Sequence, residues 1–139
     1  MPVLTRWYIK LALVYFLAAL ITGFILVAQP VFGWSTAIGA LNPVYFHLFM
    51  FGWVTQLIFG VIYWMFPKYS LQQPRGNEML GWTTLILLNV GLLLRVIGEP
   101  LDAIQTGPFW GWTLVISALL QWLAGAAFVA NTWSRVKEK

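Results

Sequence analysis

Four long apolar segments, separated by short connections that hold most of the charged residues, constrain what this chain can fold into. They cover residues 7–28, 43–66, 79–98 and 109–133. Each is close to the ~20 residues that a helix needs to cross ~30 Å of hydrocarbon. Only 9% of the residues are charged, whereas soluble domains carry roughly 25%. We therefore predict an all-α membrane protein in which residues 1–139 form one four-helix transmembrane domain.

Proline-containing pairs mark most of the expected boundaries, because proline favours the first turn of a helix and interrupts its interior. Asparagine before the second segment is a good helix N-cap. The first segment has a basic start and an apolar middle, as a signal peptide does, but its apolar run is longer than a usual signal core, so we expect a retained span. The boundary pairs are Gln29-Pro30, Asn42-Pro43, Pro67-Lys68 and Glu99-Pro100.

The distribution of basic residues predicts the orientation in the membrane. Every lysine and arginine except Arg95 lies near the N-terminus, in the 67–78 connection or near the C-terminus. The 29–42 connection has no charged residue, and the 99–108 connection has only acidic ones. By the positive-inside rule, both termini and the 67–78 connection face the cytoplasm. The apolar 29–42 connection is expected to lie along the outer membrane interface as a short helix.

Several kinds of chemistry lack the residues that they need. There is no cysteine, which excludes disulfides, thiolate metal sites, iron–sulfur clusters and covalent haem attachment. The net charge of +4 comes from residues that flank the apolar segments, where they contact lipid headgroups, so we expect no nucleic-acid partner. No span contains an acidic pair, a glycine-rich phosphate loop or a nucleophile beside a histidine.

Polar residues inside the apolar segments are the candidate functional sites, because they are costly in hydrocarbon. His47 is the only histidine, and it could ligate a metal or haem iron or hydrogen-bond a neighbouring helix. Arg95 could bind an anion such as a haem propionate, or it could snorkel to the headgroups or pair with Glu99 four residues on. The full set is His47, Thr55, Gln56, Asn89, Arg95, Ser117 and Gln121.

One face of the second segment carries Gly52, Gln56 and Gly60 at a spacing of four residues. Small residues allow helices to approach closely, and a glutamine among them can bond across the interface. This face predicts helix packing, including packing between copies of the chain, with a quinone site or proton path as the alternative. Met50 and Phe51 beside His47 suit either a flat macrocycle or ordinary helix packing.

Residues 42–67, NPVYFHLFMFGWVTQLIFGVIYWMFP, resemble the second helix of the catalytic subunit of haem–copper oxygen reductases and nitric oxide reductases. In that superfamily, a histidine near the helix start precedes glycines, an aromatic pair and a proline. The matching residues here are His47, Gly52, Gly60, the pair 63–64 and Pro67. The resemblance implies that His47 is an axial ligand of a low-spin haem near the outer face, the depth that the basic residues also predict.

The rest of the superfamily's site has no counterpart in this chain. The family's catalytic subunit has about twelve spans, and further histidines hold its copper and its second haem, whereas His47 is alone here. A complete haem–copper centre is therefore not expected, and an enzymatic role is left open. The twelve helices form three arcs of four, so the resemblance implies a homotrimer of this chain, in line with the closed symmetry of most homo-oligomers.

The leading hypothesis is a b-type haem protein of a bacterial or archaeal cytoplasmic membrane that serves electron transfer, haem handling or gas binding. His47 is its expected iron ligand and Arg95 its propionate partner, with Met50 and Phe51 beside the haem. Met50 lies on the same helix face as His47, so a sixth ligand must come from another chain, water or a gas. Two alternatives remain: a cofactor-free subunit of a larger respiratory complex, and a metal site formed by His47 from three subunits on a trimer axis.

Overall fold

The computed structural model describes residues 1–72, 74–105 and 107–136, and these residues form helices with no strand among them. Helix accounts for 86% of the structure. Four helical segments are long and apolar enough to cross a membrane, as the sequence predicted. The elements are α1 (Val3–Phe32), η1 (Thr36–Leu41), α2 (Asn42–His47), η2 (Leu48–Thr55), α3 (Gln56–Met65), α4 (Glu78–Ile104), α5 (Pro108–Thr132) and η3 (Trp133–Arg135).

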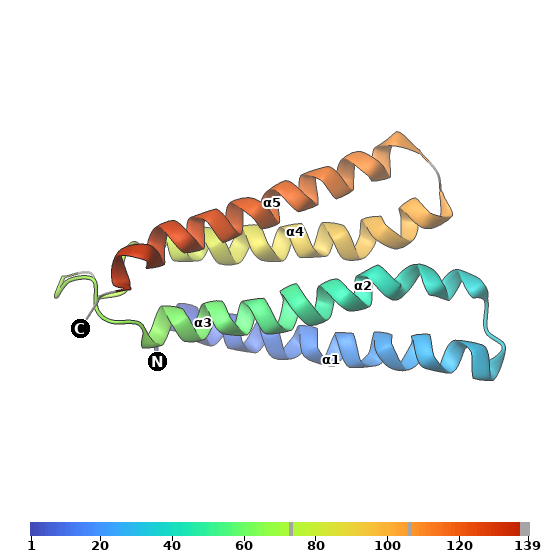
Figure 1. Ribbon diagram of the computed structural model, residues 1–139, viewed down its shortest axis with the longest axis horizontal. Helices are drawn as coiled ribbons and strands as arrows, with labels where there is room; N and C mark the ends of the chain where they lie inside the picture. Colours follow the sequence, from blue (N-terminus) through green and yellow to red (C-terminus); the bar gives the residue numbers. More distant parts are fainter. Residues whose placement is uncertain (73, 106, 137–139) are drawn as a thin grey trace.

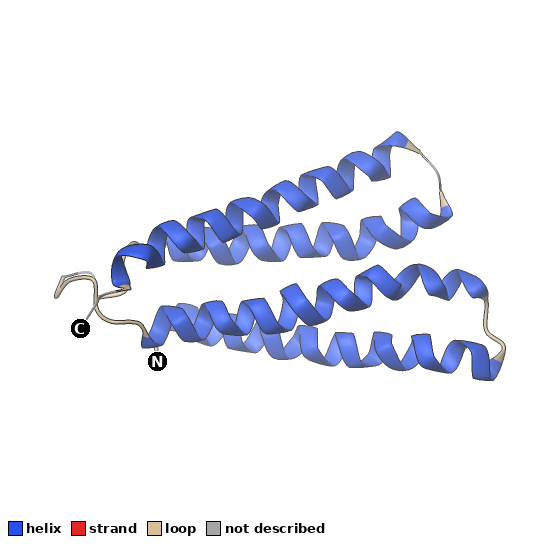
Figure 2. Ribbon diagram, viewed as in Figure 1, coloured by secondary structure: helices blue, strands red, loops and turns tan. Residues whose placement is uncertain are grey.

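The helices form two long hairpins that lie side by side (Figures 1 and 2). α1 pairs with the continuous run from η1 to α3, and α4 pairs with α5. The start of α1 and the end of α5 lie at the same end of the molecule, which we call the proximal end. The opposite end, with η1 and the connection from α4 to α5, is the distal end. α5 makes its extensive contacts with α4, so α4 joins the two hairpins.

Two of the predicted helix ends were wrong, because the prolines lie inside helices. α1 continues through Pro30 to Phe32 and stops at Gly33, whose φ of 66° is left-handed. α4 continues through Pro100 to Ile104. A proline removes one backbone donor and strains the turn before it, but close to a helix end the remaining hydrogen bonds can maintain the helix. The short helix expected in the 29–42 connection is present as η1, a 3-10 helix.

The Gly52, Gln56 and Gly60 face packs inside the chain rather than remaining free for another copy. A Cβ at Gly52 would lie 2.7 Å from Cβ of Tyr15, and a Cβ at Gly60 would lie 2.7 Å from Cβ of Tyr8. Both tyrosines belong to α1. The prediction of a close-packing face was therefore confirmed, but its use as an oligomer surface was wrong.

Polar side chains connect the helices at the middle of the bundle. Fully buried Gln56 accepts a hydrogen bond of 3.0 Å from Asn89 of α4, as expected for a glutamine at a helix interface. Ser117 of α5 donates a 2.6 Å bond to the carbonyl of Gly91. Both bonds involve α4, and they fix its rotation relative to its two neighbours. That rotation decides which α4 side chains face His47.

Candidate functional site

His47 is held in a defined orientation by the first turn of its own helix. Pro43 occupies the first turn of α2, and its carbonyl oxygen lies 2.8 Å from Nδ1 of His47, one turn later. The imidazole is 18% exposed, so it is mostly enclosed yet still reachable from outside. With its proton on Nδ1, the ring donates to this carbonyl and keeps the lone pair of Nε2 free.

Glu99 of α4 approaches the same imidazole nitrogen from the neighbouring hairpin. Its Oε1 lies 3.1 Å from Nδ1 of His47 and also accepts a 3.1 Å hydrogen bond from Nη1 of Arg95. The Glu99 side chain is only 8% exposed. The predicted pairing of Arg95 with Glu99 is thus present. The contact with His47 was not predicted, because the Glu99-Pro100 pair indicates a helix end and would place the carboxylate in a connection, whereas α4 continues to Ile104.

The two other predicted site residues differ in their relation to His47. The Phe51 ring stacks on the imidazole with centroids 5.7 Å apart and an interplanar angle of 23°. Phe51 also packs against the apolar cluster around Tyr15 and Leu92. The ring of Phe51 therefore lies between the imidazole and this part of the protein interior. Met50 is 38% exposed and belongs to the outer surface of the hairpin. The structure therefore groups His47 with Phe51, Glu99 and, through Glu99, Arg95.

The residues around His47 fit a group that takes one ligand from this chain. Histidines that bind metals usually donate the other ring N–H to a carbonyl or carboxylate, and His47 has one of each within 3.1 Å. Within residues 1–72, 74–105 and 107–136, no three histidine, cysteine or acidic side chains gather as a metal site would require. An axial haem ligand needs a single imidazole nitrogen, and the Nδ1 contact with the Pro43 carbonyl leaves Nε2 of His47 available for that role.

The helix changes its winding immediately after His47. Residues 48–55 form η2, a π-helix, between the α-helical turns of α2 and α3. π-helical turns are rare and frequently occur at functional sites. Because such a turn holds more residues than an α-helical one, η2 changes which later residues share a face with His47. Nothing in the sequence indicated this feature.

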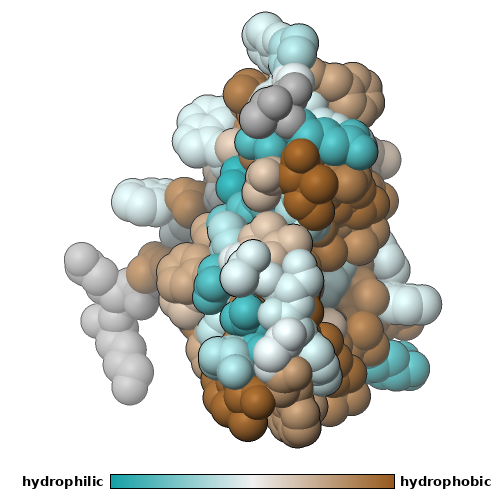
Figure 3. All heavy atoms as spheres, turned by 90° about the vertical axis from the view of Figure 1, so that its right-hand side faces the viewer, coloured by the Kyte–Doolittle hydropathy of each residue, from teal (hydrophilic) through white to brown (hydrophobic). Residues whose placement is uncertain are grey.

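Hydrophilic residues are visible from outside at the distal end (Figure 3). Figure 3 faces this end and shows hydrophilic residues through its middle, with hydrophobic side chains around them. The exposed hydrophobic residues of the long helices include Phe24 of α1 and Phe109 of α5, which are 67% and 69% exposed. The distal end thus offers a polar region framed by apolar surfaces.

Arg135 at the proximal end has a structural role that the sequence analysis missed. Its side chain is 1% exposed and donates to the carbonyls of Tyr63, Phe66 and Pro67 at 3.1, 2.9 and 3.1 Å. These carbonyls belong to the end of α3 and the residues after it, where a helix leaves acceptors unpaired. From the sequence, Arg135 is only one of the C-terminal basic residues that predict orientation, because the sequence does not say which helix end a flanking arginine will reach.

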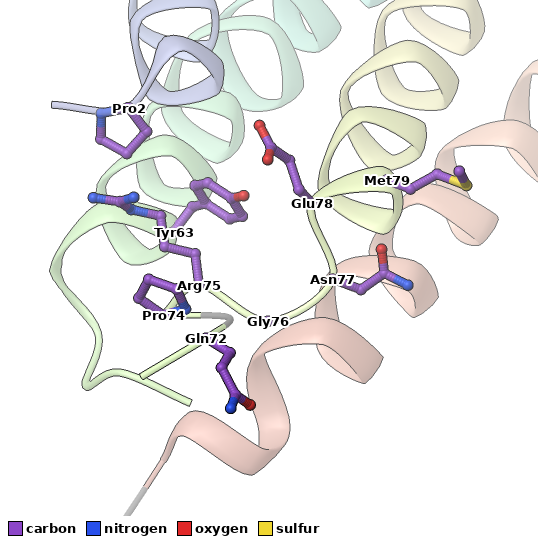
Figure 4. Close-up of a pocket in the computed structure, with 9 residues that line it drawn as sticks. All are labelled: Pro2, Tyr63, Gln72, Pro74, Arg75, Gly76, Asn77, Glu78 and Met79. Carbon is purple, nitrogen blue, oxygen red and sulfur yellow. The ribbon is translucent and has the colours of Figure 1, made fainter. Parts of the chain in front are cut away.

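A concave region lies at the proximal end, far along the bundle from His47 (Figure 1). This cavity of about 410 Å³ is lined by Tyr63, Arg75 and Glu78 among other residues. Figure 4 shows the Arg75 side chain extending beside the Tyr63 ring. The lining includes no histidine, so the cavity and the candidate ligand are separate features.

The chain matches no protein-family model, no curated protein and no solved structure. The strongest single feature is the orientation of His47 by the Pro43 carbonyl and Glu99.

Proposed function

We propose that this chain is an integral membrane protein that binds haem b through His47, as a minimal relative of one four-helix arc of the haem–copper oxidase scaffold. The observation that carries the proposal is the 2.8 Å contact between Nδ1 of His47 and the Pro43 carbonyl. The hydrogen bond to the Pro43 carbonyl uses Nδ1 and leaves Nε2 of the imidazole free to bind iron. This is the arrangement expected of a metal-binding histidine. A haem bound there supplies a one-electron iron couple with a coordination position for a second ligand or a gas.

The neighbouring residues have distinct roles in this proposal. Phe51 stacks on the imidazole and limits its rotation. Arg95, at 18% exposure, is within reach of solvent and balances negative charge at the distal end, including that of a propionate. Met50 contributes apolar surface next to His47.

The proposed membrane arrangement follows from the charge distribution. The proximal end, which carries nearly all of the basic residues, faces the cytoplasm, and His47 lies near the opposite surface. This chain offers one imidazole, so any further ligand to a bound haem would come from another chain, water or a gas. We propose a homotrimer on the basis of the resemblance. The Gly52 and Gly60 face is covered by α1 of the same chain. Contacts between the copies of a trimer must therefore use other surfaces.

The proposal is tested by the absorption of the purified protein. Wild type, His47→Ala and Phe109→Ala are expressed with a haem supply and purified in the same mild detergent. Phe109→Ala is the control, because it removes an exposed ring from α5 at the same end. The ratio of Soret to protein absorbance measures haem retention, and a pyridine haemochrome spectrum identifies the haem type.

We expect His47→Ala to lose the Soret band while it inserts and elutes in size-exclusion chromatography as wild type does. Phe109→Ala should retain the band. A colourless wild type after haem reconstitution, or an unchanged Soret ratio in His47→Ala, would contradict the ligand assignment. Elemental analysis of a colourless sample separates the alternatives: about one metal per three chains supports a site on a trimer axis, and no metal supports a cofactor-free subunit.

A further inference from the structure

We propose that Glu99 is a positioning residue for His47, and that its carboxylate sets how strongly the imidazole donates to a haem iron. This inference rests on the proposed function for its last step only. Its structural basis is the 3.1 Å approach of Oε1 of Glu99 to Nδ1 of His47. The carboxylate comes from α4, whereas His47 ends α2, so the interaction couples the two hairpins.

Two oxygens lie close enough to Nδ1 to accept its single proton: one hydrogen-bonds it in the structure, and the other is at ion-pair distance. The Pro43 carbonyl at 2.8 Å is neutral and belongs to the same helix. The Glu99 carboxylate at 3.1 Å is charged, and hydrogen bonds to charged acceptors are roughly twice as strong as neutral ones. Electron density withdrawn from the N–H bond moves into the ring, which makes Nε2 a better donor. Such outer partners are known to raise the basicity of a ligating histidine.

The surroundings of Glu99 act in two opposing ways on its interaction with the imidazole. Its side chain is 8% exposed, so water screens its charge poorly. Oε1 is shared between His47 and Arg95, while Oε2 is buried with no partner among the described residues. The only cation bonded to this carboxylate in the described part of the chain is Arg95. Arg95 therefore holds Oε1 in place and offsets part of its charge.

The first test needs no haem. Because His47 is the only histidine, protein labelled with ¹⁵N-histidine gives the ring signals of one residue by NMR in detergent. At a pH where the imidazole is neutral, we expect wild type to show the tautomer protonated on Nδ1, with its proton resonance shifted downfield by the carboxylate. Glu99→Gln, which keeps the shape and removes the charge, should move that resonance upfield.

Two further variants make this test specific. Asp102→Asn removes a charge from the same end of α4 without removing a partner of His47, so its spectrum should match wild type. Glu99→Asp keeps the charge but withdraws the carboxylate by one methylene, and it provides the measurement if Glu99→Gln does not insert. Unchanged Nδ1 and Hδ1 resonances in both Glu99 variants would overturn the inference. A shift of equal size in Asp102→Asn would also overturn it, because the effect would then be long-range charge alone.

The second test uses the haem-loaded protein and measures the midpoint potential. Weaker donation from His47 favours Fe(II), so Glu99→Gln should raise the potential by about 59 mV, which is a tenfold change in the one-electron equilibrium. Asp102→Asn should change it clearly less. If haem binds and neither the potential nor the NMR signal moves, the inference fails and the proposed function stands. If no haem binds, the proposed function fails, and the NMR test alone decides the role of Glu99.

Discussion

Gly60→Ala should destabilise the protein, because α1 occupies the position that the new methyl group would need. A Cβ at residue 60 would lie 2.7 Å from Cβ and 3.4 Å from Cγ of Tyr8, and 3.8 Å from the Thr5 carbonyl oxygen. The nearest atom is a Cβ, close to the α1 backbone. Tyr8 is 2% exposed and its hydroxyl donates a 3.2 Å bond to Gly81 of α4. Relief therefore requires α1 to move away from α3.

The magnitude follows from two opposing effects. Overpacking a well-packed interior costs about 1–3 kcal/mol, and the upper part of that range applies because a backbone must shift. Alanine is favoured over glycine in a helix interior by about 1 kcal/mol, which offsets part of the cost. We expect a net loss of about 2 kcal/mol in the free energy of unfolding. Gly125→Ala, in α5, is the matched control, because no atom lies within 4 Å of its new Cβ.

The assay is reversible unfolding by SDS in mixed micelles, followed by the fluorescence of the nine tryptophans. Gly60→Ala should unfold at a lower SDS fraction than wild type, and Gly125→Ala at the same or a higher fraction. Equal midpoints for the two variants would refute the reasoning. That result would mean that α1 and α3 are not packed as closely as the structure has them.

Four further predictions concern other parts of the molecule. Arg135→Gln should lower the unfolding free energy by about 1.5–3 kcal/mol in the same assay, because it removes charged donors from three carbonyls; a loss as large in Arg135→Lys would be expected if the fork of the guanidinium matters. Reporter fusions at Gln72 and after the C-terminus should report cytoplasm and fusions at Ser35 and Gln105 the outside, and a C-terminus outside would overturn the orientation. Native mass spectrometry in several mild detergents should show three copies, and a monomer in all of them would contradict the trimer. Arg95→Leu should reduce the Soret ratio less than His47→Ala does, because a partly exposed ion pair contributes modestly.

The number and order of the long helices could be predicted from the sequence alone. Hydropathy is a local property, so four apolar runs were enough to place four long helices, although α1 and α4 continue past the predicted ends at Pro30 and Pro100. The packing face of Gly52, Gln56 and Gly60 was also predictable, because small residues at a spacing of four share one side of a helix. What covers that face was not, and only the structure assigns it to Tyr8 and Tyr15 of α1.

The site around His47 shows most clearly what tertiary structure decided. The sequence singled out His47 because it is the only histidine, and it paired Arg95 with Glu99 because four residues make one helical turn. The contact of Glu99 with His47 depends on α4 continuing through Pro100 and on its rotation toward α2. Arg135 reaches the end of α3 for the same kind of reason. Contacts between residues 50 or more positions apart depend on the relative placement of two helices, and no local pattern in either helix specifies that placement.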